Sequence, residues 1–138
     1  MKKVLALMLV TVMTLALVAC GGPPKEKFDQ ADASFAKIEV LYQENLTLVE
    51  KINNSGYEDV QNVCDTYKSE LAEVKTSLDE MKKLFNENRD TYTEEELDNI
   101  LKSQDEIVQA LKDDKKVTED EIAKIEQVVK EADAQSAQ

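Results

Sequence analysis

The 138-residue sequence contains no histidine and no tryptophan, and Arg89 is its single arginine. Histidine is the usual general base and transition-metal ligand near neutral pH, so its absence removes most hydrolase mechanisms and most zinc sites. We therefore expect a protein that is not an enzyme and that holds no metal and no cofactor.

Glycine, proline and cysteine are also scarce. Both prolines and two of the three glycines fall within residues 21–24, and the two cysteines are Cys20 and Cys64. From residue 25 onward the chain is a mixture rich in Glu, Lys, Asp, Ala and Leu, which favours helices over sustained strands. The composition therefore predicts an all-α fold.

Basic residues are in the minority, since 29 acidic and 17 basic residues give a net charge of −12. Nucleic-acid binding requires a basic face, and anionic lipid repels an acidic protein. We expect no nucleic-acid partner, and attachment to a membrane has to come from something other than surface charge.

The first 19 residues have the order of an export signal. Lys2 and Lys3 precede an apolar run that extends from Val4 to Ala19 and is relieved only by two threonines. The run falls short of the ~20 apolar residues of a comfortable membrane span and ends abruptly at Cys20. This arrangement predicts a signal peptide at residues 1–19.

The stretch Leu17-Val18-Ala19-Cys20 places a branched apolar residue, a small residue and a cysteine in the order of a lipobox. In this feature the chain resembles the precursor of a bacterial lipoprotein. The resemblance implies cleavage before Cys20, a diacylglyceryl group on the Cys20 sulfur and often acylation, as by palmitate, of the new amino terminus. It also implies a lipid anchor on the extracytoplasmic face of a bacterial membrane, either cytoplasmic or outer. An ordinary cleaved signal with a chance cysteine is the alternative.

After such cleavage, residues 20–25 would form a short lipidated tether. The 119 residues that remain after cleavage, tether included, are enough for one small domain with a core. They contain 15 basic and 29 acidic residues, which gives a net charge of −14. The lipid must therefore hold the protein to the membrane, and two or three acyl chains at ~0.8 kcal/mol per methylene are sufficient.

Apolar residues after the tether recur in steps of three and four, as on one face of a helix. A first helix is predicted over residues 26–52, with this stripe: Phe28, Ala31, Phe35, Ile38, Tyr42, Asn45, Val49 and Ile52. A second helix is predicted to begin at a capping box formed by Ser55 and Glu58. Its seam is the most regular in the chain: Tyr57, Val60, Cys64, Tyr67, Leu71, Val74, Leu78, Met81 and Phe85. A seam of this length predicts coiled-coil-like packing.

Residues 86–91 are polar and rich in asparagine, which predicts a turn after the second helix. Thr93 and Glu96 then form a capping box, and Tyr92 and Leu97 stand at the positions of a hydrophobic staple. These signals predict a third helix that continues through Leu111.

Thr118 and Glu121 repeat the capping signature, so we predict a break before Thr118 and a separate fourth helix. This helix is expected to bury four residues: Ile122, Ile125, Val128 and Val129. One bent helix is the alternative, because the apolar phase continues if Lys115 and Thr118 occupy stripe positions. Residues 26–135 as a whole predict an antiparallel three- to four-helix bundle.

Few residues suggest specific chemistry. The acidic clusters at residues 94–98 and 119–121 lack the spacing and turn glycine of a calcium loop, and acids are favoured at helix starts by the macrodipole alone. Cys64 lies in a heptad seam with no histidine to activate it, which favours a packed thiol over a nucleophile. Asn45 and Gln104 interrupt apolar stripes, so they either fix the helix register or lie at the solvent edge, and we prefer the second interpretation.

The four tyrosines are expected in the core with their hydroxyls near the surface, although they could instead line a pocket between helices. For function, we expect a lipid-anchored, non-enzymatic helical module that binds a protein partner as an accessory subunit, adaptor or self-protection factor. A small-ligand carrier is the alternative, and a structural envelope spacer is a third hypothesis. A carrier needs a sizeable internal cavity, whereas an interaction module needs an exposed apolar strip, and Val40, which lies off the buried arc, points to such a strip.

Overall fold

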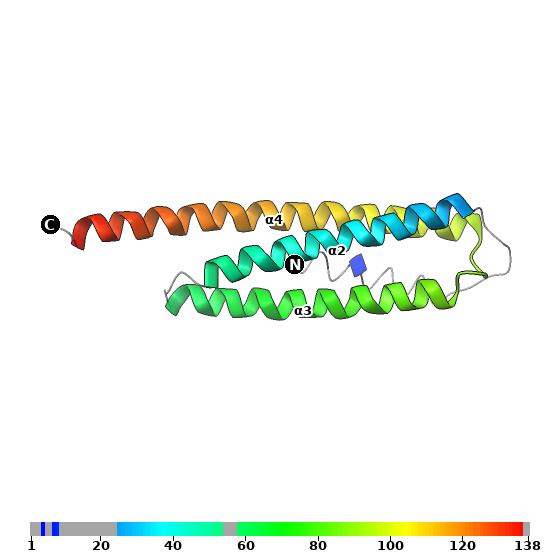
Figure 1. The fold of residues 1–138 in the computed structure, drawn as a ribbon, viewed down its shortest axis with the longest axis horizontal. Coiled ribbons are helices and arrows are strands. Elements are labelled where there is room, and N and C mark those ends of the chain that lie inside the picture. Colours follow the sequence, from blue (N-terminus) through cyan, green and yellow to red (C-terminus); the bar gives the residue numbers. More distant parts are fainter. Residues whose placement is uncertain (1–3, 5–6, 9–24, 54–57, 137–138) are drawn as a thin grey trace.

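The computed structural model describes residues 4, 7–8, 25–53 and 58–136. Three long α-helices account for almost all of them: α2 (Lys25–Asn53), α3 (Glu58–Glu87) and α4 (Glu94–Ser136). No strand occurs in this described part of the chain. The predicted all-α helical bundle is confirmed, and Figure 1 shows its three helices side by side.

Helix α2 is the central element of the bundle, because it contacts both α3 and α4. It runs antiparallel to α3 and parallel to α4 (Figure 1). An ion pair between Glu39 and Lys82 joins it to α3, and a 3.0 Å ion pair between Lys51 and Glu126 joins it to α4. Over the described residues, no Cα atom of α3 lies within 8 Å of a Cα atom of α4. Helices α3 and α4 therefore both pack against α2, and their backbones stay further from each other than from α2.

The apolar stripes predicted from the sequence form the core. On α2 every member of the predicted stripe is buried. On α3 the described seam residues are buried, apart from Tyr67, which is partly buried. The buried seam residues are Cys64, Leu71, Val74, Leu78, Met81 and Phe85. Tyr57 and the side chain of Val60 lie outside the described residues. The heptad pattern therefore identified the face of α3 that packs inward.

An aromatic cluster fills the end of the bundle where the chain passes from α3 to α4. The ring centroid of Phe85 lies 5.3 Å from that of Phe35 and 5.7 Å from those of Phe28 and Tyr92. The guanidinium of Arg89 lies 4.9 Å from the centroid of the Phe28 ring, within the range of a cation–π contact. The only arginine of the chain thus covers its main aromatic cluster.

The predicted start of the third helix is confirmed. The backbone N–H of Glu96 donates to the Thr93 hydroxyl at 3.2 Å, and the backbone N–H of Thr93 donates to the Glu96 carboxylate at 2.7 Å. This is the reciprocal pattern of a capping box. Tyr92 and Leu97, the expected staple residues, are both buried in the core.

The predicted break before Thr118 is wrong, because α4 is one uninterrupted helix from Glu94 to Ser136. The Thr118 side chain is buried within it, and its hydroxyl donates to the backbone carbonyl of Asp114 at 2.9 Å, one turn earlier. No glycine or proline interrupts the preceding residues, and Lys115 forms ion pairs with Glu44 of α2 and with Glu119 one turn later. Continuing the helix therefore keeps these contacts and buries Thr118, and these gains outweigh a local capping signal.

The long α4 extends past the other two helices at its C-terminal end (Figure 1). At 1.5 Å per residue, its 43 residues span about 64 Å. Ile122 is still buried and Ile125 is partly buried, but the Val128 side chain is 63% exposed. The expectation that Val128 is buried in a fourth helix is therefore wrong, and the side chain of Val129 lies outside the described residues.

Three described residues of the N-terminal segment belong to the same core. Val4 and Met8 are fully buried, and Leu7 packs against the core cluster. Figure 1 draws the stretch with Leu7 and Met8 between α2 and α3. No helix in the described part of the chain is both long enough and apolar enough to cross a membrane.

Candidate functional site

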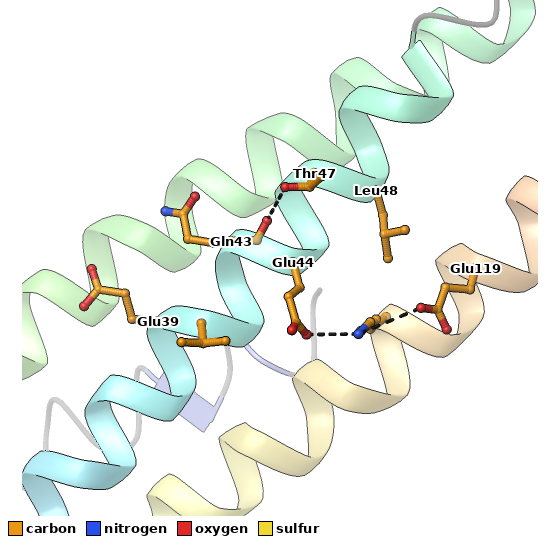
Figure 2. A pocket seen from close by; sticks show the side chains of 8 residues that line it. Glu39, Gln43, Glu44, Thr47, Leu48 and Glu119 are labelled. Atoms are coloured by element: carbon orange, nitrogen blue, oxygen red, sulfur yellow. Dashed lines mark hydrogen bonds and ion pairs between the residues drawn. The ribbon is translucent and has the colours of Figure 1, made fainter.

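A groove on the outer side of the α2–α4 pair is the candidate site (Figure 2). Its volume is about 490 Å³. Helix α2 contributes two rows of side chains spaced by four residues. One row is Glu39, Gln43 and Thr47, and the other is Val40, Glu44 and Leu48. Helix α4 contributes one pair with the same spacing, Lys115 and Glu119. Residues four apart lie above one another on a helix, so each row forms a continuous ridge along the groove.

The apolar part of this groove is small and accessible. Val40 is 57% exposed, and Leu48 is partly buried against the core. Both belong to the same row of α2, where Val40 lies one turn before Glu44 and Leu48 lies one turn after it. The exposure of Val40 expected from the sequence is confirmed. Val40 and Leu48 lie about 12 Å apart along α2, so a partner needs two apolar side chains to cover both.

Charged side chains surround these two apolar residues. The Lys115 ammonium lies 3.0 Å from the Glu44 carboxylate and 3.9 Å from the Glu119 carboxylate (Figure 2). The hydrogen bond to Glu44 raises the pKa of Lys115 above its usual value. The hydrogen bond from Lys82 lowers the pKa of Glu39. Both shifts favour the charged forms of Lys115 and Glu39, and Lys115 lies between the side chains of Glu44 and Glu119.

Two buried amides lie in the α2–α4 interface. The Asn45 amide donates to the backbone carbonyls of Leu41 and Leu111, at 2.8 and 3.1 Å, and the Gln104 amide donates to that of Ala31 at 3.2 Å. Both side chains are fully buried, so the preferred interpretation that they lie at the solvent edge is wrong. Each bond to the facing helix ties α2 to α4 at one position along their length.

These two amides are only partly satisfied. Among the described residues, neither the carbonyl oxygen of Asn45 nor that of Gln104 has a hydrogen-bond partner. A buried acceptor without a partner destabilises the fold, whereas the donated bonds favour one register. The two amides therefore favour a fixed α2–α4 alignment at some cost in stability.

The other residues considered in the sequence have structural surroundings. Cys64 is a free, buried thiol, and burial raises its pKa, as expected for a packed cysteine. Tyr42 and Tyr92 are buried and Tyr67 is partly buried. The Tyr92 hydroxyl lies 3.4 Å from the backbone carbonyl of Leu84, to which it donates. Cys20, the predicted lipidation site, lies outside the described residues.

The two acidic clusters also have different roles. In the first, Glu96 caps the helix, and Glu94 and Asp98 form ion pairs with Lys27. The second lies inside α4, so the interpretation of residues 119–121 as a helix start is wrong. In the described part of the chain, no group of three or more Asp, Glu, Cys or His residues is arranged to hold a metal ion.

The sequence identified one end of the groove but missed the other. Val40 was recognisable because it interrupts the polar face of an otherwise regular helix. Lys115 and Glu119 were missed as groove residues because the expected break separated them, and only a continuous helix aligns them with Glu44.

No family model, no curated protein and no solved structure matches this chain. Its function is therefore inferred from its own residues and their arrangement.

Proposed function

We propose that this chain is a bacterial lipoprotein, anchored through Cys20 on the extracytoplasmic face of a membrane, whose helices form a non-enzymatic protein-interaction module. The observation that carries the proposal is the open groove with the exposed Val40 inside a rim of charged residues. An accessory subunit, an adaptor or a self-protection factor would each use such a surface.

The groove has the elements of a small interaction surface. Protein interfaces place apolar side chains at the centre and polar groups at the rim. Here Val40 and Leu48 supply the apolar centre, while Lys115 and the glutamates beside it supply directional charges. The projecting end of α4, with Val128 exposed, adds further surface next to the bundle (Figure 1).

The anchor and the surface require separate tests. Intact-mass analysis of the protein from its own membrane is expected to show a chain that begins at a lipid-modified Cys20. A chain that begins elsewhere, or an unmodified Cys20, would overturn the anchor.

For the surface, a photo-reactive residue is placed at Val40 in one variant and at Ala72 in a control. Ala72 is an exposed α3 residue outside the groove. We expect an adduct of defined mass in the Val40 variant only, and its loss when Leu48→Asp is added. Equal adducts at both positions would contradict a specific surface.

A small-ligand carrier is the second hypothesis, and the groove volume of about 490 Å³ is its support. Ligand sites commonly have volumes of ~300–1,000 Å³, but they enclose most of the ligand. Native mass spectrometry of the purified lipoprotein discriminates between the two hypotheses. A carrier would retain a small molecule that Val40→Asp releases, whereas an interaction module would not. A structural spacer is the third hypothesis, and its reach would be limited to the ~64 Å of α4.

A further inference from the structure

The buried position of Val4 and Met8 is the starting observation. Both side chains are fully buried in the core, and Leu7 is packed against it. The blue ribbon of this stretch lies between α2 and α3 in Figure 1 and next to α2 in Figure 2. These residues therefore pack among the three helices.

The arrangement of the helices explains why there is room for this segment. Helices α3 and α4 both pack on α2, yet no Cα pair between their described residues comes within 8 Å. Directly packed helices lie about 8–10 Å apart between axes, which brings Cα atoms closer than that limit. Even so, the inward faces of both helices are buried, with Leu78 on α3 and Ile107 on α4 fully covered.

We propose that the α3–α4 side of the bundle is a binding groove for a short aliphatic segment that follows basic residues, and that Val4, Leu7 and Met8 occupy it in the unprocessed chain. Cleavage before Cys20 removes this occupant and leaves the groove to a segment of the same chemistry in a partner protein. The proposal rests on the proposed function, because it assigns a second surface and a partner type to the interaction module.

Chemistry on both sides supports this occupant. The segment seated in the bundle is aliphatic, with valine, leucine and methionine at the described positions, and Lys2 and Lys3 precede it in the sequence. The processed chain carries a net charge of −14, which attracts a basic partner and opposes close association of two identical copies. Acyl chains on Cys20 are drawn into the bilayer and are poor competitors for the groove.

The test uses the full chain, folded before it is cut. Cys20→Ser prevents lipidation, and a site-specific protease sequence replaces residues 21–24. After cleavage, native mass spectrometry and gel filtration determine whether the N-terminal peptide stays bound, and circular dichroism reports the helix content. We expect the peptide to remain bound and to be displaced by an excess of synthetic peptide with the sequence of residues 1–19.

Peptide variants determine whether this binding is specific. The Met8→Asp peptide should bind about 30-fold more weakly and displace correspondingly less. This factor corresponds to the loss of the hydrophobic contribution of one buried methionine side chain. Met8→Leu keeps the apolar volume and should displace like the parent peptide. Val40→Asp in the bundle, which alters the other groove, should leave retention unchanged.

Four results would overturn the proposal. They are release of the peptide on cleavage without loss of helix content, equal binding of the Met8→Asp peptide, dimerisation of the cut chain in place of peptide binding, and loss of helix content that added peptide does not restore. Restoration of helix content by the added peptide would support it. These measurements use an unlipidated protein without its cellular partner, so their outcome is independent of the tests of the Cys20 anchor and the Val40 surface.

Discussion

Gln104→Met is expected to stabilise the protein, although it removes a hydrogen bond. The Gln104 amide makes one bond, to the Ala31 carbonyl, and its own carbonyl oxygen is buried without a partner among the described residues. A hydrogen bond contributes about 1 kcal/mol net, whereas a buried unsatisfied acceptor costs about 1–3 kcal/mol. The Ala31 carbonyl lies within α2 and retains its helical N–H donor after the substitution. Methionine has a similar length and shape, so a net gain of about 1 kcal/mol is expected.

Asn45→Leu is the matched comparison. Asn45 makes two bonds and also has one unpaired oxygen, so the lost bonds nearly offset the relieved acceptor. We expect its stability to stay within about 1 kcal/mol of the parent and below that of Gln104→Met. Urea unfolding of the full-length Cys20→Ser protein, compared at equal m-value, measures both. A loss of more than about 1 kcal/mol in Gln104→Met would refute the reasoning, because it would mean that the buried amide is satisfied and stabilising.

Three further predictions concern the core, the course of α4 and the response to alkaline pH. Leu78→Ala should lower the free energy of unfolding in urea by about 2–5 kcal/mol, because Leu78 is fully buried. Val128→Ala, at the exposed end of α4, should change it by no more than about 0.5 kcal/mol. Similar losses in the two variants would show that the core is misplaced. Thr118→Gly should be about 1 kcal/mol less stable than Thr118→Ala because Thr118 is inside a helix; the opposite order would indicate an N-cap. Burial raises the pKa of Tyr92 from 10.0 to about 12, so the unfolded state loses its proton first and stability should fall between pH 10 and 12 by up to about 1.4 kcal/mol per pH unit. Tyr92→Phe removes this titrating group, so stability should fall less steeply between pH 10 and 12. An unchanged pH dependence would contradict the raised pKa of Tyr92.

The first two long helices were predictable because their apolar periodicity coincides with tertiary packing. Every stripe position predicted on α2 is buried, and so are Leu71, Leu78 and their described neighbours on the α3 seam, apart from the partly buried Tyr67. The start of α4 at Thr93 was predictable for a different reason. The polar turn before it ends α3, and the capping groups then have free backbone N–H groups to bind.

The same capping signature failed at Thr118 because its surroundings differ. The residues before Thr118 favour a helix, and Lys115 gains a contact with Glu44 only if that helix continues. A hydroxyl that would cap a helix start can also donate to the carbonyl one turn earlier, and the Thr118 hydroxyl does so to Asp114. Sequence spacing alone does not distinguish these two states, because the tertiary contact that decides between them comes from α2.

The buried amides show a related limit of sequence patterns. A polar residue in an apolar stripe is compatible with the solvent edge and with the interior, and the distinction depends on how wide the covered face is. Helix α2 is covered by α3 on one side and by α4 on the other, so its buried arc is broad enough to include Asn45. The carbonyl of Leu111 on the facing helix then supplies the acceptor that allows the amide to be buried.

The N-terminal segment presents a competition between two apolar environments. Its sequence indicates export and removal, yet the hydrophobic effect acts on Val4 and Met8 in the same way as on the core residues around them. A chain that folds before processing buries the segment in the bundle, whereas a chain processed before folding has the α3–α4 groove without its first occupant. Single amphipathic helices are only marginally stable until their apolar faces are covered. The groove of a processed chain therefore either closes by bringing α3 and α4 together or binds an aliphatic segment from elsewhere, and retention of the cut peptide distinguishes these two outcomes.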